Sequence, residues 1–580
     1  MTLYTLSGIA GSGKTERLIA HAIQRLAQHR KTAFVCHSKQ LCRQTHQRLI
    51  DAGISVAKIT MICSSNRREA SVGLRLQDHL KHARTDLGEI LICTHAAFFA
   101  CAHWHRRDLW CPLIDEVPQV HADLSRRLYQ NFAILTGLLA PDDLSQPYTM
   151  VGAKDAAAEA LLRSRVDTAR SDEVNELHRD LLLAVLDPNR EVWCDSANWL
   201  KVTAGIDPAD TAETREERGK LRLYGLLKPS FFDGFDQPVI AAACVEDHLF
   251  HALWQRQGAD VRPAVHITSR YGDCSAARHD GSRLVLRLLC GADATRSWSK
   301  TFADAPLSDG RTPRQSIRDF CEQELAGRTY AFVTNANPDR DDIPSGAILL
   351  GPHCHGLNHL RHIKTIVISS ALMPDRRYQA FLRGLGVSDE AIHRDIAWIT
   401  AYQGMMRTAL RDAGGGQVVC YIADPCAAAY IAGLFPGCSV EHVPCFAAAV
   451  AQQKRGPKPK ELTAEQQRER RNARDRLRYA ARKRAVGQEV ATSGAEMIDC
   501  VDDEDRPFAQ WERGYAPVQN AGDIGARAVD YLLTEQIGGA GTQDNASRAG
   551  TAQRHALASP CSRAQHHARY PVSGPPPSPL

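Results

Sequence analysis

Short apolar runs alternate with amphipathic segments through the first 120 residues of the chain. The runs that predict buried strands are residues 3–7, 32–36, 89–94 and 111–114. Between them, residues 16–28 and 39–50 place apolar side chains at helical spacing. Strand and helix patterns that alternate in this way favour a parallel sheet covered by helices. We therefore predict a first α/β domain over residues 1–120.

The pattern becomes more polar and mostly helical over residues 121–235. We interpret this stretch as a mainly helical insertion, after which the apolar run in residues 236–261 returns to the first sheet. A second α/β series is expected over residues 262–450. Its predicted strands are residues 329–333, 347–350, 365–368 and 417–422. The predicted fold class is α/β, with two domains built on parallel sheets.

Composition changes after residue 450. Residues 452–484 contain 13 Lys and Arg against 4 Asp and Glu, whereas the net charge of the whole chain is +5, so the remainder is net acidic. We expect a basic segment over residues 451–490. Residues 491–580 are rich in Ala, Gly, Ser and Pro, and we expect a mostly disordered tail there.

Bulk properties exclude several classes of protein. A chain of 580 residues with 44% hydrophobic content can build more than one core. Its 18 cysteines are scattered without a CxxC pair, which argues against a zinc site and against a secreted disulfide framework. The N-terminus lacks the regions of a signal peptide, and no apolar window approaches the length of a membrane span. We expect a cytoplasmic protein with no membrane partner.

Candidate chemistry begins at residues 8–15, Gly-Ile-Ala-Gly-Ser-Gly-Lys-Thr, between a predicted strand and a predicted helix. Glycines at these positions allow backbone N–H groups to wrap around phosphate oxygens. The ammonium group of Lys14 would reach the β- and γ-phosphates, and the Thr15 hydroxyl would coordinate Mg²⁺. The predicted nucleotide-binding residues are Gly8, Gly11, Ser12, Gly13, Lys14 and Thr15.

Two adjacent carboxylates, Asp115 and Glu116, end the apolar run at 111–114. This places them at the carboxyl edge of a strand, where open α/β sheets bind ligands. We assign Asp115 to Mg²⁺, through water, and Glu116 to polarising the attacking water. The predicted cofactors are ATP and Mg²⁺.

The order of these motifs resembles superfamily 2 (DEAD/DEAH-like) helicases and translocases, of the type carried by phages and mobile elements. The phosphate loop matches motif I and the Asp-Glu pair matches motif II. Residues 34–41 resemble motif Ia and residues 91–97 resemble motif Ib. In the family these segments contact the nucleic-acid backbone, which implies such a role for Lys39 and Thr94. The resemblance also implies that both α/β domains are RecA-like P-loop NTPase domains.

Further segments follow in the family's order. Residues 241–247 occupy the place of motif III, 332–337 resemble motif IV and 355–358 resemble motif V. The motif IV likeness implies a nucleic-acid contact by Asn335.

Gln403, Arg407 and Arg411 resemble motif VI, whose arginines act on the γ-phosphate from the second domain. The family has arginines four and seven residues after the glutamine, whereas here they come four and eight residues after it. Arg407 is therefore the better candidate for the arginine finger, and Gln403 and Arg411 complete the catalytic set with Glu116.

The basic segment contains an AT-hook-like run at residues 454–460, with Lys458 in place of the usual arginine. An arginine-rich helical pattern follows over residues 464–484. We expect largely sequence-independent DNA contacts there, and a solvated charged helix or a targeting-like run is the alternative. The predicted contact residues are Arg455, Lys458, Arg471 and Arg474.

These features together predict an ATP-dependent helicase or translocase acting on DNA, with RNA as the alternative substrate. Replication, recombination or repair is the expected pathway, with proteins of replication or recombination as further partners. A DNA-packaging ATPase is one alternative, but it calls for a nuclease domain where this chain is basic and of low complexity. Another is a DNA-binding replication or regulatory factor that uses ATP only as a switch.

Overall fold

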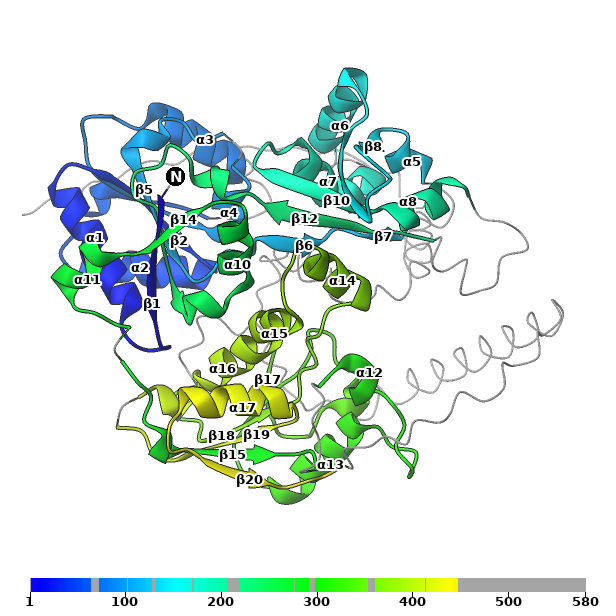
Figure 1. Ribbon diagram of the computed structural model, residues 1–580. Helices are drawn as coiled ribbons and strands as arrows, with labels where there is room; N and C mark the ends of the chain where they lie inside the picture. The colour runs from blue at the N-terminus through cyan, green and yellow to red at the C-terminus, as the bar shows by residue number, and fades with distance from the viewer. Residues whose placement is uncertain are drawn as a thin grey trace, which may run out of the picture. The chain divides into compact units, whose positions relative to one another are not determined.

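The computed structural model describes the following residues: 2–63, 72–101, 103–127, 132–168, 172–205, 219–275, 277–291, 298–352, 360–412 and 414–446 (Figure 1). All of them lie in one compact unit, Met1–Pro517. Within these residues the strands form a seven-stranded, a five-stranded and a six-stranded sheet, together with a two-stranded ribbon.

The seven-stranded sheet is wholly parallel. Its strands, in spatial order, are β14 (Asp260–Pro263), β1 (Thr2–Gly8), β13 (Val239–Ala243), β5 (Trp110–Asp115), β2 (Lys31–Cys36), β4 (Glu89–Thr94) and β3 (Ile59–Ile62). The pairing sets Gly8 opposite Ala243, and Ala241 opposite Asp115. The carboxyl ends of β1, β13 and β5 therefore meet at one edge of the sheet.

Helices cover this sheet, as the alternating pattern predicts. They are α1 (Lys14–Ala27), α2 (Lys39–Asp51), α3 (Val72–His82), α4 (His95–Phe99), α10 (Leu249–Arg256) and α11 (Val265–Tyr271). The buried face of α1 contributes Leu18, Ala22 and Leu26 to a core with Phe34 of β2. Strand β14 pairs with β1, so the first domain runs past residue 261, where the sequence pattern suggested its end. This strand is short and mostly polar, which explains why its apolar pattern is weak.

The insertion combines helices with an antiparallel sheet. Its helices are α5 (Ala133–Thr136), α6 (Ala156–Thr168), α7 (Glu173–Leu186) and α8 (Ser196–Thr203). Its sheet has the order β6 (His121–Asp123), β12 (Leu223–Leu227), β10 (Arg190–Asp195), β9 (Tyr148–Ala153) and β8 (Leu139–Pro141), and β7 (Arg126–Arg127) pairs with β11 (Lys220–Leu221). A mainly helical description omits this sheet, because its strands are short and several pair across long stretches of sequence, such as β12 with β6.

The six-stranded sheet of the second domain is also parallel. Its order is β17 (Ile348–Leu350), β16 (Ala331–Val333), β18 (Thr365–Ile368), β19 (Val418–Ile422), β15 (Leu284–Leu288) and β20 (Ser439–His442). The helices are α12 (Lys300–Ala303), α13 (Pro313–Glu324), α14 (Arg376–Gly384), α15 (Asp389–His393), α16 (Ile399–Met405) and α17 (Pro425–Leu434), with a π-helical turn, η8 (Arg394–Trp398), between α15 and α16. The sequence pattern missed β15, which pairs with both β19 and β20.

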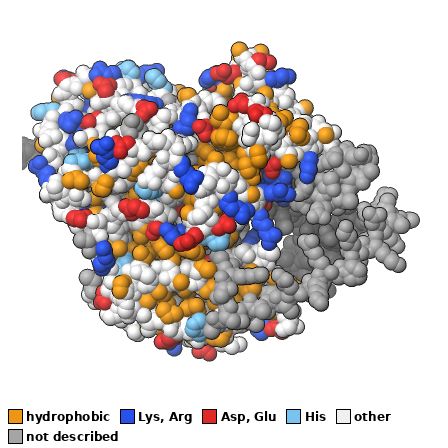
Figure 2. Space-filling view, viewed as in Figure 1, with side chains coloured by type: hydrophobic (Ala, Val, Ile, Leu, Met, Phe, Trp, Pro, Cys, Tyr) orange, Lys and Arg blue, Asp and Glu red, His pale blue; other side chains and the backbone are white. Residues whose placement is uncertain are grey.

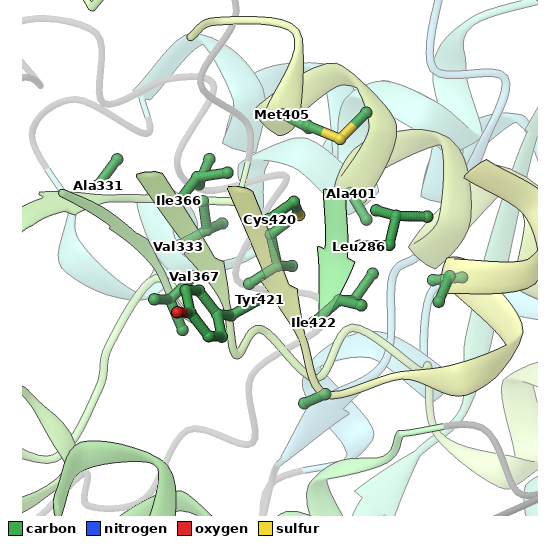
Figure 3. Close-up of a cluster of buried hydrophobic side chains, with 14 of the residues drawn as sticks. Leu286, Ala331, Val333, Ile366, Val367, Ala401, Met405, Cys420, Tyr421 and Ile422 are labelled. Atoms are coloured by element: carbon green, nitrogen blue, oxygen red, sulfur yellow. The ribbon is translucent and has the colours of Figure 1, made fainter. Parts of the chain in front are cut away.

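Side chains on the two faces of this sheet pack against different helices. Figure 3 shows Met405 and Ala401 of α16 over the face that carries Cys420 and Leu286, with Tyr421 on the other face. Figure 1 shows α16 and α17 on one side of the sheet and α13 on the other. Among the residues that the structure describes, every helix is too short or too polar to cross a lipid bilayer.

The turn that leads into β15 provides a test of this packing. A methyl group added at Gly281 would lie 2.6 Å from the Cys438 amide nitrogen and 2.6 Å from the Phe435 carbonyl oxygen, both backbone atoms. We expect Gly281→Ala to lower the free energy of unfolding by roughly 1–3 kcal/mol, because backbone must shift to admit the methyl group. Gly73→Ala is the matched control, since no atom lies within 4 Å of its added methyl group. Equal thermal melting shifts in both variants would contradict the prediction.

Candidate functional site

The loop between β1 and α1 has the backbone that its glycines permit. Gly11 and Gly13 have φ values of 84° and 81°, a region that residues with a side chain rarely occupy. A methyl group at Gly8 would lie 2.7 Å from the Cys274 carbonyl oxygen. The hydroxyl oxygen of Ser12 is buried without a hydrogen-bond partner among the described residues. The loop therefore offers backbone amides and an unsatisfied hydroxyl at the start of a helix, as a phosphate site requires.

The Lys14 ammonium group is held inside this loop. It donates hydrogen bonds to the carbonyl oxygens of Gly8, at 3.1 Å, and Ile9, at 2.7 Å. Burial lowers the pKa of Lys14, while the carboxylates of Glu116 and Asp115 oppose that shift. A desolvated cation whose hydrogen bonds, among the described residues, go to carbonyl oxygens is well placed to gain from an anionic phosphate.

Asp115 ends β5 beside the first residues of α1. The Thr15 hydroxyl donates to its carboxylate, with an Oγ1–Oδ2 distance of 3.0 Å. Burial and the neighbouring Glu116 charge raise the pKa of Asp115 to about 7. Mg²⁺ is commonly bound by one or two protein oxygens together with substrate phosphates, so this pair fits the ion. Across the described residues, no cluster of three or more His, Cys, Asp or Glu side chains offers a self-sufficient metal site.

Glu116 adopts a left-handed backbone conformation, with a φ of 78°. Such a conformation costs a residue other than glycine roughly 1–3 kcal/mol and is held only where neighbouring structure fixes it. Here the Glu116 N–H donates to the Ala241 carbonyl oxygen on β13, at 2.8 Å. Strand β13 therefore helps to set the direction in which the Glu116 side chain leaves the sheet.

His95 supports the same pair from the protein interior, and the sequence analysis missed it. Its Nε2 lies 3.0 Å from the Asp115 carbonyl oxygen, and its ring stacks on that of His37, with the centroids 5.6 Å apart. Burial lowers the pKa of His95 to about 3, so the ring is neutral. Because its partner is a carbonyl, the proton of this neutral ring lies on Nε2. The sequence signal that could have identified His95 is its position directly after Thr94, within the segment that resembles motif Ib.

The second domain brings Arg411 against the phosphate loop. The space that a methyl group at Gly11 would fill lies 3.7 Å from Arg411 Cγ. Burial and the charge of Arg407 lower the pKa of Arg411, and the Glu116 carboxylate opposes that shift. Arg407 is 8% exposed, and its buried Nε has no hydrogen-bond partner within the described part of the chain. Arg411 thus lies beside the loop at Gly11, while Gln403 lies partly exposed on α16.

Tyr402, next to Gln403, makes a second contact that the sequence did not reveal. Its hydroxyl oxygen accepts a hydrogen bond from the Ala10 N–H, at 2.8 Å, and lies 2.5 Å from Nε2 of His279. The His279 ring stacks on Phe435, with centroids 4.1 Å apart. No motif marks this tyrosine, so only the tertiary structure identifies it.

The residues predicted to contact nucleic acid are engaged within the fold. Lys39 is 6% exposed in the first turn of α2, and the Thr94 hydroxyl caps α4 by accepting the Ala97 N–H at 3.2 Å. The Asn335 side chain makes two hydrogen bonds to the backbone of Ala371, at 2.7 and 3.2 Å.

Other parts of the expected nucleic-acid interface lie outside the described residues. They are the motif V candidate at residues 355–358 and the basic-segment residues Arg455, Lys458, Arg471 and Arg474. On the face in Figure 2, Lys and Arg side chains mix with Asp and Glu over the described surface.

Comparisons with known proteins give distant structural likenesses. No protein-family model and no curated protein matches the chain. Dbp5 of S. cerevisiae, bound to RNA and ADP BeF3, aligns over 76% of this chain and 86% of its own, with 11% identity and a TM-score of 0.29. RecG bound to a three-way DNA junction aligns over 72% and 39%, with 11% identity and a TM-score of 0.29. T4 UvsW aligns over 77% and 74%, with 9% identity and a TM-score of 0.17.

With likenesses this distant, the class of the protein follows from its own architecture. Two parallel sheets covered by helices, the first with a phosphate loop after β1 and paired acids after β5, define two RecA-like P-loop NTPase domains. The described chain is thus an α/β protein with an inserted α+β segment between β5 and β13.

The raised pKa of Asp115 predicts how stability depends on pH in the presence of a chelator. A carboxyl with a folded-state pKa of about 7 and an ordinary pKa of 3.8 favours the folded state when protonated. That contribution is lost as the pH rises from about 4 to about 7, at a cost of about 2–4 kcal/mol. Asp115→Asn should therefore gain stability over the unaltered chain at pH 8 but not at pH 4.5. Denaturant titrations measure this, and an equal difference at both pH values would refute it.

Proposed function

We propose that this protein is an ATP-dependent helicase or translocase that couples ATP hydrolysis to movement on nucleic acid. The observation that carries the proposal is the placement of Arg411 against Gly11 of the phosphate loop. The loop belongs to the first domain and the arginine to the second. A nucleotide bound at this loop would therefore interact with both domains, and its hydrolysis would change what holds them together.

Each residue then has a defined task. The loop amides and Lys14 bind the β- and γ-phosphates, while Thr15 and Asp115 hold Mg²⁺. When bound, Mg²⁺ neutralises charge on the phosphate oxygens. Glu116 accepts a hydrogen bond from the attacking water and orients it, and Arg411 stabilises charge on the transferred phosphoryl group.

DNA is the proposed track, with RNA as the alternative. Support comes from the order of the motifs and from the charge of the segment at residues 451–490, which suits sequence-independent binding to phosphates. The proposed setting is replication, recombination or repair in a phage or mobile element, and it depends on the same likeness of motifs.

The two arginines can be separated by experiment. We expect Arg411→Ala to lower kcat for ATP hydrolysis by about 10³-fold or more, because it removes the charge to which we assign stabilisation of the γ-phosphate. Arg407→Ala should mainly lower the melting temperature, because its guanidinium is buried. Steady-state kinetics and thermal melts of both variants provide the measurement. If Arg407→Ala abolished turnover at an unchanged melting temperature while Arg411→Ala did not, the roles would be reversed.

The proposed activity has a direct test in turnover with and without nucleic acid. Lys14→Ala should abolish nucleotide binding, whereas Glu116→Gln should bind ATP with Mg²⁺ and hydrolyse it at least about 10²-fold more slowly. Lys58→Ala, an exposed lysine on the same domain, is the matched control. Single-stranded DNA should stimulate hydrolysis by the unaltered chain.

A strand-displacement assay then identifies the nucleic acid along which the protein moves. Duplexes with a 5′ tail, a 3′ tail or a fork, together with an RNA duplex, distinguish DNA from RNA and give the polarity. ATP binding without nucleic-acid-stimulated hydrolysis would show a switch instead of a motor. If Glu116→Gln left nucleic-acid-stimulated hydrolysis intact, the assignment of Glu116 as the residue that orients the attacking water would be wrong.

A further inference from the structure

A buried cluster of two histidines and one aspartate joins three parts of the protein. His248 follows the 3₁₀ turn η5 (Val245–Asp247) at the end of β13, and His121 begins the insertion. Asp395 lies in the π-helical turn η8 of the second domain. Nδ1 of His248 lies 2.6 Å from one Asp395 oxygen, and Nε2 of His121 lies 3.5 Å from the other.

Hydrogen-bond geometry fixes the charge of His248. One ring nitrogen faces the Asp395 carboxylate, and the other lies 3.1 Å from the Ala243 carbonyl oxygen. Both partners are acceptors, so both nitrogens must donate and the ring must be an imidazolium. Burial opposes the charge, but the hydrogen bond to Asp395 and the charges of Asp395 and Glu116 raise the pKa of His248.

A short path leads from this imidazolium to Glu116. His248 donates to the carbonyl oxygen of Ala243, and the Glu116 N–H donates to that of Ala241 on the same strand. The two acceptors lie two residues apart at the carboxyl end of β13. The carbonyl groups at this strand end therefore contact both the left-handed Glu116 and the charged ring.

Asp395 connects the path to the second domain. The π-helical turn that carries it leads directly into α16, whose Tyr402 bonds the phosphate loop. Turns of this kind are frequent at functional sites. Arg394, in the same turn, pairs with Asp247 of η5 at 2.8 Å. Two ion pairs thus join the end of β13 to this turn.

The insertion reinforces the same junction. The hydroxyl of Tyr378 on α14 lies 2.6 Å from Nδ1 of His121, and the ring of Phe381, on the same helix, stacks on Tyr224 of β12 with centroids 4.4 Å apart. Side chains from these elements pack around the cluster, whose own side chains are 7–16% exposed, so water screens its charges less than it would at a surface.

We propose that His248 is a positioning residue of the nucleotide site, anchored by Asp395, which ties the orientation of Glu116 to the second domain. The inference builds on the proposed function, because it assigns a purpose to the junction between the two domains. It adds residues that lie outside the phosphate loop, the Asp-Glu pair and the distal arginines.

Three variants test the proposal: His248→Gln, Asp395→Asn and the double variant. Each should lower kcat for ATP hydrolysis by about 10- to 100-fold, the range found for groups that orient the ligands of a metal site. The dissociation constant of a fluorescent ATP analogue should change less than about threefold, since neither residue touches the phosphate loop. His251→Gln, on the next turn of the same segment, is the matched control.

The double variant separates coupling from general damage. Its two neutral amides preserve the packing where Asp395→Asn alone leaves a buried cation unpaired. Because the two residues act as one unit, we expect the kcat of the double variant to be no lower than that of the single variant with the lower kcat. Multiplied losses, or an unchanged kcat in all three folded variants, would overturn the proposal.

Amide hydrogen exchange gives a readout that does not need turnover. In the unaltered chain and in His251→Gln, ATP analogue with Mg²⁺ should change exchange in residues 394–398, and in His248→Gln it should not. A chain that binds nucleotide and shows this response without hydrolysis would refute the proposed function but keep the coupling. Hydrolysis with the same exchange response in His248→Gln as in the control would keep the function and refute the coupling.

Discussion

Opposite charges buried at the carboxyl edge of the first sheet form the constraint on which the rest depends. Lys14 and Asp115 both lose most of their water there, and each has only partial compensation from its neighbours. Lys14 is satisfied by loop carbonyls, and Asp115 by the hydroxyl of Thr15. Such an arrangement costs free energy in isolation and is repaid when an anion and a divalent cation enter together. The loop, the strand order and the strained backbone of Glu116 together place the charged groups at this edge.

The position of β13 connects this edge of the sheet to the second domain. Because β13 lies between β1 and β5, its last residues touch both the phosphate loop and the paired acids. The chain beyond β13 turns into η5 and His248, which contact the second domain. The end of this one strand therefore lies between the nucleotide site and the residues that contact the second domain. A small displacement at the nucleotide site can therefore shift the contact with the second domain, since packed interiors transmit strain.

The insertion helps to join the first sheet to helices of the second domain. Its aromatic side chains share one continuous core with the first sheet and with helices α14 and α15. Those two helices belong to the second domain by sequence, yet they pack with the first. The π-helical turn after α15 is then the point where the chain passes from one packed body to the next.

The sequence by itself determined the phosphate loop, the paired acids and the alternation of strands and helices. Those features are local: the loop is a contiguous run, and burial on both faces makes a parallel strand read as an apolar run. From spacing alone it favoured Arg407 over Arg411, and it did not find His95, Tyr402 or the His248–Asp395 pair. Their roles depend on contacts between residues 20 to 392 positions apart, and on which side of a helix meets the loop. Only the packing of the sheets, the insertion and the helices fixes those distances, because no local pattern records how far-separated elements meet.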